Sequence, residues 1–108
     1  MLRERLKGNL DLLLLTVLAT GPAHGYEIAE RLRTHSAGAF DLPEGTVYPA
    51  LHRLEAHGWI ASAWRVEAGR RRRVYELTSR GRRQLAVQRR EWSAFIAGMA
   101  AVLGGSPA

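Results

Sequence analysis

The 108-residue chain contains no cysteine. This absence excludes a disulfide framework, a thiolate metal site and a thiol nucleophile, and it is compatible with a reducing compartment. A membrane-spanning segment is also missing, because the leucine-rich run at residues 10–19 is too short to cross a bilayer and is followed by Gly21 and Pro22. Since no signal peptide is recognisable either, we expect a cytoplasmic protein without a membrane partner.

The chain also lacks the groups of residues that enzymes and metal sites need. It shows no nucleophile beside a base, no paired carboxylates and no glycine-rich phosphate loop. His52 and His57 are five residues apart, which is not the spacing of three or four that places two ligands on one face of a helix. We therefore predict that the protein is not an enzyme and that it uses no cofactor or metal ion.

Arginine, in contrast, is abundant and unevenly distributed. Fifteen of the 16 basic residues are arginine, and the formal net charge is +6. Residues 65–108 contain ten arginines and three acidic residues, whereas residues 1–64 carry almost no net charge. The planar guanidinium keeps its charge and pairs with phosphate or with the edge of guanine. Such concentrated charge favours a polyanionic partner, with a solvated basic face as the alternative.

Residues 43–60 are predicted to form a helix with two different faces, ended by Gly58. Apolar residues recur at a spacing of three and four on the face that should meet a core. The first turn is expected to begin at Pro43, where a missing N–H costs nothing. The other face carries residues suited to a ligand or to a groove of nucleic acid, namely Thr46, Tyr48, Pro49, His52 and Arg53.

Two further helices are predicted before this one, at residues 10–19 and 25–34, and a β-hairpin after it. The alternation of side chains predicts strands at residues 60–66 and 74–77. With a turn centred near Gly69 and Arg70, Trp64 should lie opposite Tyr75, and Ser62 opposite Leu77. Trp64 is then expected in the core, and the four arginines at residues 70–73 at the tip of the hairpin.

The last helix is predicted from the N-cap Thr78 to about Leu103, with a frayed tail at residues 106–108. About 25 residues at about 1.5 Å each give roughly 37 Å, which is longer than the preceding residues can cover. Its apolar stripe therefore predicts a partner helix and a dimer. The stripe consists of Leu85, Trp92, Phe95, Ile96, Met99, Val102 and Leu103.

Three short helices followed by a hairpin with a basic tip describe a winged helix-turn-helix, a mainly α (α+β) fold. In this arrangement the third helix enters the major groove, and the hairpin, or wing, follows the backbone or the minor groove. We assign residues 1–78 to the DNA-binding domain and residues 79–108 to the dimerisation helix and tail. Double-stranded DNA and a second copy of the chain are the expected partners.

Three strings in the sequence resemble the PadR family of transcriptional regulators: HGYEI at residues 24–28, GTVYPALHRLE at residues 45–55 and YELTSRG at residues 75–81. The resemblance implies a dimeric winged-helix regulator that usually represses, of the short subfamily with a single C-terminal helix. It places Gly45, Thr46, Tyr48 and His52 on the recognition helix, and Tyr26 near the DNA backbone. It also places Arg70, Arg71, Arg72 and Arg73 on the wing.

The resemblance further implies a candidate ligand site at Trp92. Similar members of the subfamily stack flat ligands on a tryptophan of the C-terminal helix at the dimer interface. Packing within the dimer core is the leading interpretation of Trp92, and ligand stacking is the alternative. A small hydrophobic or aromatic effector is therefore a candidate partner.

The leading hypothesis is a homodimeric repressor that binds a palindromic operator and is released by such an effector. One alternative is a protein–protein adaptor that uses the winged-helix scaffold without binding DNA. A general RNA-binding protein is another, although the sequence offers no exposed strand face rich in stacking residues.

Overall fold

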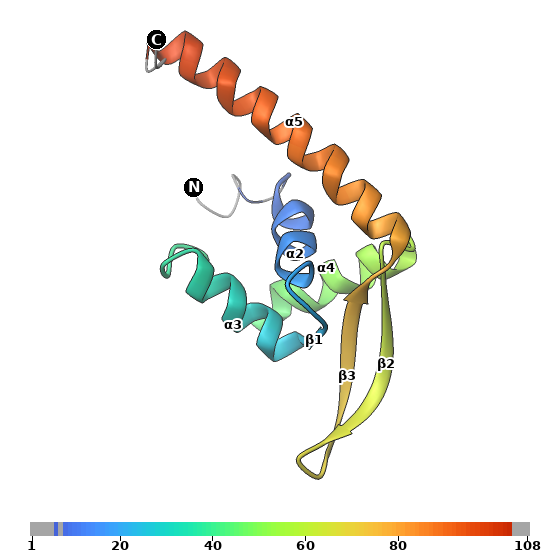
Figure 1. Cartoon of the computed structure of the whole chain (residues 1–108). Helices are drawn as coiled ribbons and strands as arrows, with labels where there is room; N and C mark the ends of the chain where they lie inside the picture. The colour runs from blue at the N-terminus through green and yellow to red at the C-terminus, as the bar shows by residue number, and fades with distance from the viewer. Residues whose placement is uncertain (1–5, 7, 105–108) are drawn as a thin grey trace.

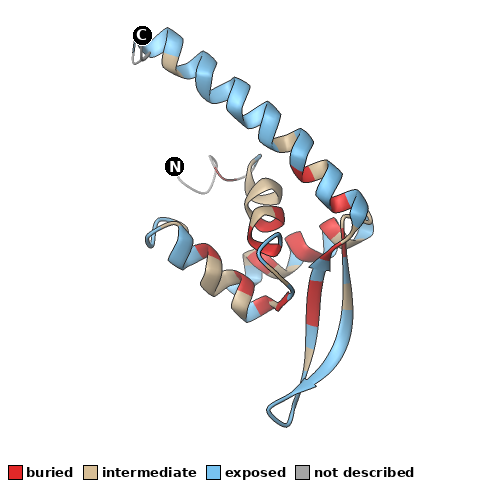
Figure 2. Cartoon of the chain, in the orientation of Figure 1, coloured by how far each residue is buried: buried red, intermediate tan, exposed pale blue. Residues whose placement is uncertain are grey.

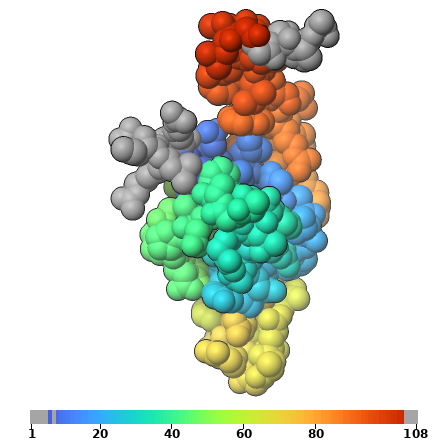
Figure 3. All heavy atoms as spheres, turned by 90° about the vertical axis from the view of Figure 1, so that its left-hand side faces the viewer, coloured from blue at the N-terminus to red at the C-terminus, as the bar shows by residue number. Residues whose placement is uncertain are grey.

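The computed structural model describes residue 6 and residues 8–104. The predicted tail at residues 106–108 lies outside this range. Three short helices form a bundle, the wing extends from one end of it and the long α5 from the other (Figures 1 and 3). This confirms a winged helix-turn-helix with a long C-terminal helix. The elements in order are α2 (Leu10–Leu18), β1 (Ala23–His24), α3 (Gly25–His35), α4 (Glu44–Ala56), β2 (Ile60–Glu67), β3 (Arg70–Leu77) and α5 (Ser79–Leu103).

The core lies where the helices meet the base of the wing (Figure 2). The leucine-rich α2 supplies Leu14, Leu15 and Leu18 to it and contacts α3, α4 and α5, as expected for a helix that is apolar on more than one side. The inner face of α4 adds Val47, Ala50, Leu51 and Leu54, all of them buried as predicted. The outer wing and most of α5 remain exposed.

The sheet has a third strand that the sequence did not predict. β1 is two residues long and pairs with β3 in the order β1-β3-β2, with Ala23 opposite Tyr75 and His24 opposite Val74. Two residues are too few to produce an alternating pattern, so β1 left no signal in the sequence. The strand fixes the start of α3 directly against the wing.

The predicted register of the hairpin was wrong by two residues. Ser62 lies opposite Tyr75 and Trp64 opposite Arg73. The turn consists of Ala68 and Gly69, which both have positive φ (52° and 74°), as a two-residue type I′ turn requires. The prediction placed the turn one residue later because alanine rarely adopts this conformation. As a result both strands are longer than predicted, and the four arginines lie along β3 rather than at the tip.

α4 begins one residue later than predicted, because Pro43 is its N-cap and has extended backbone angles (φ −71°, ψ 155°). Pro49 lies inside the helix, where its missing N–H affects only the first turns. After the C-cap His57, Gly58 has φ +78° and ends the helix as predicted.

α5 begins as predicted at the N-cap Thr78, whose Oγ1 accepts a hydrogen bond from the Gly81 N–H (3.0 Å). The same hydroxyl donates to the carbonyl of Gly58 (2.6 Å), so the helix start is joined to the end of α4. Gly104, with φ +77°, caps the other end. None of the helices in the described part of the chain has the length and hydrophobicity required to span a membrane.

Candidate DNA-binding surface

A groove of about 440 Å³ lies between the N-terminal turns of α3 and α4 and the wing. It brings together three parts of the chain that are far apart in sequence. We call it the wing groove, and its lining residues are His24, Tyr26, Glu44, Tyr48, His52, Trp64, Arg70, Arg71, Arg72, Arg73 and Tyr75. The predicted site residues Tyr26, Tyr48, His52 and the four wing arginines are therefore placed on one surface.

The other predicted residues of α4 lie outside this lining. Gly45 and Pro49 are exposed, and Thr46 is half-buried. Arg53 forms an ion pair with Asp11 in the first turn of α2, and Asp11 belongs to a different cavity. The guanidinium of Arg53 is thus engaged with the helical bundle, a contact across 42 residues that helical spacing within α4 does not indicate.

Tyr48 occupies a slot that only glycine leaves open. Gly25 starts α3, and a Cβ added there would lie 2.5 Å from Cε1 and 2.6 Å from the hydroxyl of Tyr48. No such approach occurs between real side chains, so an alanine at residue 25 would displace the ring. The ring also packs against the core. Gly25 therefore fixes the position of Tyr48 at the edge of the wing groove.

His24 connects the start of α3 to the wing. Its Nδ1 accepts a hydrogen bond from the Glu27 N–H (3.3 Å), and the Glu27 carboxylate accepts one from the His24 N–H (3.2 Å), which together form a capping box. Its Nε2 lies 3.0 Å from Nη1 of Arg72, and its ring stacks beside Tyr26. Sequence reasoning missed His24, because its partner Arg72 is 48 residues away.

Arg73 is connected to α4 in a similar way. Its Nε donates to Oγ of Ser62 (2.9 Å), and that hydroxyl donates to the Glu55 carboxylate (2.7 Å). Arg73 Nη2 itself lies 4.0 Å from Glu55. In the described part of the chain, no side-chain hydrogen bond or ion pair engages Arg70 or Arg71. The four arginines therefore divide into two that join the wing to the helices and two with free N–H groups.

Trp64 is not in the core, contrary to our prediction. In the actual register it lies opposite Arg73 rather than Tyr75, and 53% of its surface is exposed. Tyr75 takes the buried position next to the helices. Burial raises the pKa of Tyr75 above its ordinary value, and the nearby Arg73 guanidinium only partly offsets this, so the hydroxyl stays protonated at neutral pH.

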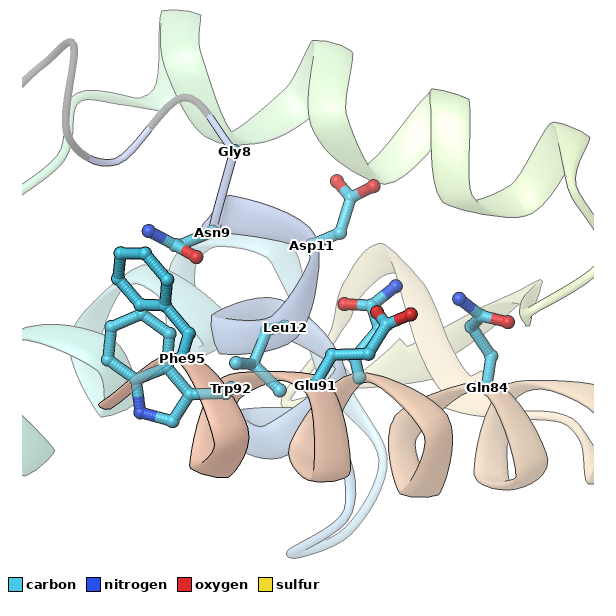
Figure 4. Close-up of a pocket in the computed structure, with 9 residues that line it drawn as sticks. Gly8, Asn9, Asp11, Leu12, Gln84, Glu91, Trp92 and Phe95 are labelled. Carbon is cyan, nitrogen blue, oxygen red and sulfur yellow. The ribbon is translucent and has the colours of Figure 1, made fainter. Parts of the chain in front are cut away.

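A second cavity, of about 390 Å³, lies between the start of α2 and the middle of α5 (Figure 4). The rings of Trp92 and Phe95 stand together at one end of it, with centroids 5.7 Å apart. The carboxylates of Asp11 and Glu91 and the amide of Gln84 also line it. Sequence reasoning pointed to Trp92 but missed Asp11, because α2 and α5 are brought together only by the fold.

The apolar stripe of α5 is only partly covered by the protomer. Leu85 is buried in the protomer's own core, whereas the exposed fraction rises from 39% at Trp92 to 86% at Val102. Phe95, Ile96, Met99 and Leu103 are exposed as well. Among the residues that the structure describes, no group of three or more histidine or acidic side chains is arranged to hold a metal ion.

An α-helical bundle with a basic wing beside its third helix is the architecture of a winged-helix transcriptional regulator. The sequence pattern of the Transcriptional regulator PadR-like family matches residues 14–87, and the chain belongs to this family. The resemblance seen in the sequence is thereby confirmed. Transcriptional regulator Rv3488 of Mycobacterium tuberculosis is 39% identical over 89 residues, which are 82% of this chain and 80% of that protein.

Solved structures agree with this assignment. The crystal structure of a PadR family transcriptional regulator from Eggerthella lenta has a TM-score of 0.83 and 31% identity, over 95% of this chain and 88% of that one. The structure of a transcriptional regulator from Clostridium thermocellum has the same TM-score and 28% identity, over 91% and 93% of the two chains. The similarity therefore extends over at least nine-tenths of this chain.

Proposed function

We propose that the protein is a homodimeric repressor that acts in the cytoplasm and binds a palindromic operator in double-stranded DNA. The observation that carries this proposal is the wing groove, where Tyr48 and His52 of α4 lie beside the four arginines of β3. α4 is the element that enters the major groove, and the wing follows the adjacent backbone. Tyr and His supply hydrogen bonds and apolar contact to base edges, whereas arginine binds phosphate.

The contacts of the wing arginines support a division of roles. Arg72 and Arg73 are engaged with His24 and Ser62, and they hold the wing at a fixed distance from α3 and α4. Arg70 and Arg71 supply the phosphate contacts, and Tyr26 supports them from the start of α3. Gly45, Thr46 and Pro49 allow the first turns of α4 to approach the bases closely. Arg53 acts by positioning α4 through Asp11.

Selection of bound sequences from random double-stranded DNA, followed by binding measurements, tests this proposal. A Tyr48→Ala, His52→Ala double variant should bind the selected operator at least about thirtyfold more weakly, since two base contacts of about 1–3 kcal/mol each contribute at least about 2 kcal/mol. Its affinity for unrelated DNA should change little. His35→Ala is the matched control, because His35 is exposed at the far end of α3. Unchanged affinity and specificity of the double variant would contradict the assigned role of α4.

We also propose that residues 79–108 form the dimerisation segment and residues 1–78 the DNA-binding domain. The exposed apolar stripe of α5 supports this division, because a second copy of the helix is the surface that matches its length and composition. Leu85, which fills the core of its own protomer, is the exception within the stripe. A two-fold dimer presents two copies of α4, which accounts for a palindromic operator.

A small flat aromatic effector is proposed to bind in the cavity beside Trp92 and release the repressor from DNA. The paired rings of Trp92 and Phe95 offer a stacking surface, and residues at the start of α2 form another wall of the cavity. Titrating a panel of flat aromatic compounds should quench tryptophan fluorescence and lower operator affinity for the active members. Trp92→Ala should abolish that response, and its operator affinity without effector serves as its own reference, because Trp92 also belongs to the apolar stripe of α5. Release that persists in the Trp92→Ala variant would exclude Trp92 as the ligand site.

A further inference from the structure

Trp64 holds an unusual position for a large apolar side chain. It lies in the middle of β2 on the outer wing, is 53% exposed, and lines the wing groove between α4 and β3. Tryptophan is usually buried for most of its surface, so its exposure here needs a specific reason. The guanidinium groups of two arginines lie over its ring.

Two guanidinium groups stack on the indole. The Cζ atom of Arg71 lies 4.6 Å from the ring centroid and that of Arg73 lies 5.3 Å from it. Arg73 is directly opposite Trp64 in the hairpin and Arg71 is two residues earlier in β3, nearer the turn, so all three side chains project from the same face. A guanidinium that stacks on an aromatic face keeps its N–H edges available for an anion.

The two stacked arginines differ in their remaining contacts. Arg73 donates to Ser62, which in turn donates to Glu55 of α4, so its charge is partly balanced and its position is fixed. Arg71 lies over the indole and stays exposed, and no acidic side chain in the described part of the chain pairs with it. The stack is therefore anchored to α4 at its inner end, and it presents an unbalanced positive charge at its outer end.

We propose that Trp64, Arg71 and Arg73 form a single contact surface for the sugar–phosphate backbone of DNA. The Arg71 guanidinium, held on the indole, donates to a phosphate. The exposed part of the Trp64 ring contacts the adjacent deoxyribose, and Arg73 keeps the ring in place. This inference rests on the proposed DNA binding. It gives Trp64 a binding role, whereas our sequence prediction gave it a role in the core.

If this stack contacts the DNA backbone, its loss should change DNA affinity in a different way than if it contacts the bases. Contacts to phosphate and sugar position the protein without distinguishing sequences, so their loss weakens binding to every DNA by the same factor. A tryptophan that inserted between bases would instead change the preferred sequence when it is replaced. Comparing the selected operator with unrelated DNA therefore separates the two roles.

Substitutions at three residues on one face of the wing test the stack. Trp64→Leu removes the aromatic face, and Arg71→Lys keeps the charge but loses the planar group. Each should weaken binding about fivefold to tenfold, by equal factors for operator and unrelated DNA. Val66→Ala is the matched control, because Val66 is 75% exposed on the same face and opposite Arg71, and it should stay within about twofold of the wild type. Arg71→Lys should leave the slope of log affinity against log salt unchanged, whereas Arg71→Ala should reduce its magnitude by about two, about one for each protomer of the proposed dimer.

A measurement on the wild-type protein tests the proposal even if a variant folds incorrectly. Operator DNA should protect part of the tryptophan fluorescence from quenching by acrylamide, and this protection should be absent in the Trp64→Leu variant. The proposal would be overturned if both Trp64→Leu and Arg71→Lys bound DNA with wild-type affinity. It would also be overturned if DNA protected the tryptophan fluorescence from acrylamide equally in the wild type and in Trp64→Leu. A shift in preferred sequence would overturn the backbone role. A wild-type protein that binds no DNA would instead refute the proposed function itself.

Discussion

Replacing Gly81 with alanine should lower the free energy of unfolding by about 3 kcal/mol, because the added methyl group has no space and the backbone must move. A Cβ at residue 81 would lie 1.8 Å from the carbonyl oxygen of Trp59 and 2.8 Å from its carbonyl carbon. That same carbonyl accepts a hydrogen bond from the Thr78 N–H (3.1 Å). The substitution therefore separates the start of α5 from the corner between α4 and β2.

Urea unfolding followed by circular dichroism, at one fixed protein concentration, measures this effect. Gly98→Ala is the matched control within the same helix, because nothing lies within 4 Å of the Cβ position at residue 98. That control should keep or raise stability by up to about 1 kcal/mol, since alanine favours helix over glycine. Equal stability of the Gly81→Ala variant and the wild type would show that α5 is not seated on Trp59.

Ile96→Glu should convert the proposed dimer into a monomer and reduce operator affinity at least about a hundredfold, because the two half-sites can no longer be bound together. Ile96 is exposed in the centre of the α5 stripe, with Phe95 and Met99 beside it. A carboxylate there would be buried without a partner in any interface that covers the stripe.

Sedimentation velocity gives the oligomeric state, and binding to full and half operators gives the affinity. Val87→Glu provides the matched control, because Val87 is also exposed and lies nine residues away, about two and a half turns, on the opposite side of α5. The control should remain a dimer. If the Ile96→Glu variant sediments as a dimer over the same range of protein concentration as the wild type, another surface joins the two chains.

The helices and the outer face of α4 were predictable because burial makes apolar residues recur with the helical period in the sequence. Val47, Ala50, Leu51 and Leu54 had to face the core, which left Tyr48 and His52 on the other side of α4. The ends of α5 were predictable for a similar reason, since Thr78 and Gly104 have side chains or backbone angles suited to helix caps.

The hairpin shows where this reasoning fails. Its register depends on the turn, and the turn depends on Ala68 adopting a positive φ that the identity of the residue does not favour. An error of one residue in the turn centre moved every cross-strand pair by two positions. Trp64 kept its face of the hairpin but exchanged a buried partner for Arg73, and its interpretation changed from core residue to surface residue.

Contacts between distant segments were the other part that the sequence could not reveal. The contact of His24 with Arg72, the ion pair of Arg53 with Asp11 and the approach of Tyr48 to Gly25 join residues with no shared period. Each depends on the angles at which α2, α3 and α4 pack. Side-chain identity alone therefore suggested Tyr48 and His52 as candidate residues, and only the packed structure showed how their surface is held.

The junction at Thr78 has a mechanical consequence for the proposed dimer. Thr78 joins the wing to α5 and bonds to the end of α4 through Gly58, while Arg72 and Arg73 fasten the wing to α3 and α4. The wing, α4 and α5 are thus parts of one stiff arm with a length of roughly 37 Å along α5. A rotation of about 5° between two such arms shifts their far ends by about 3 Å, comparable to the rise of one base pair, about 3.4 Å. The crossing angle of the two α5 helices would then set which half-site spacing the dimer can span.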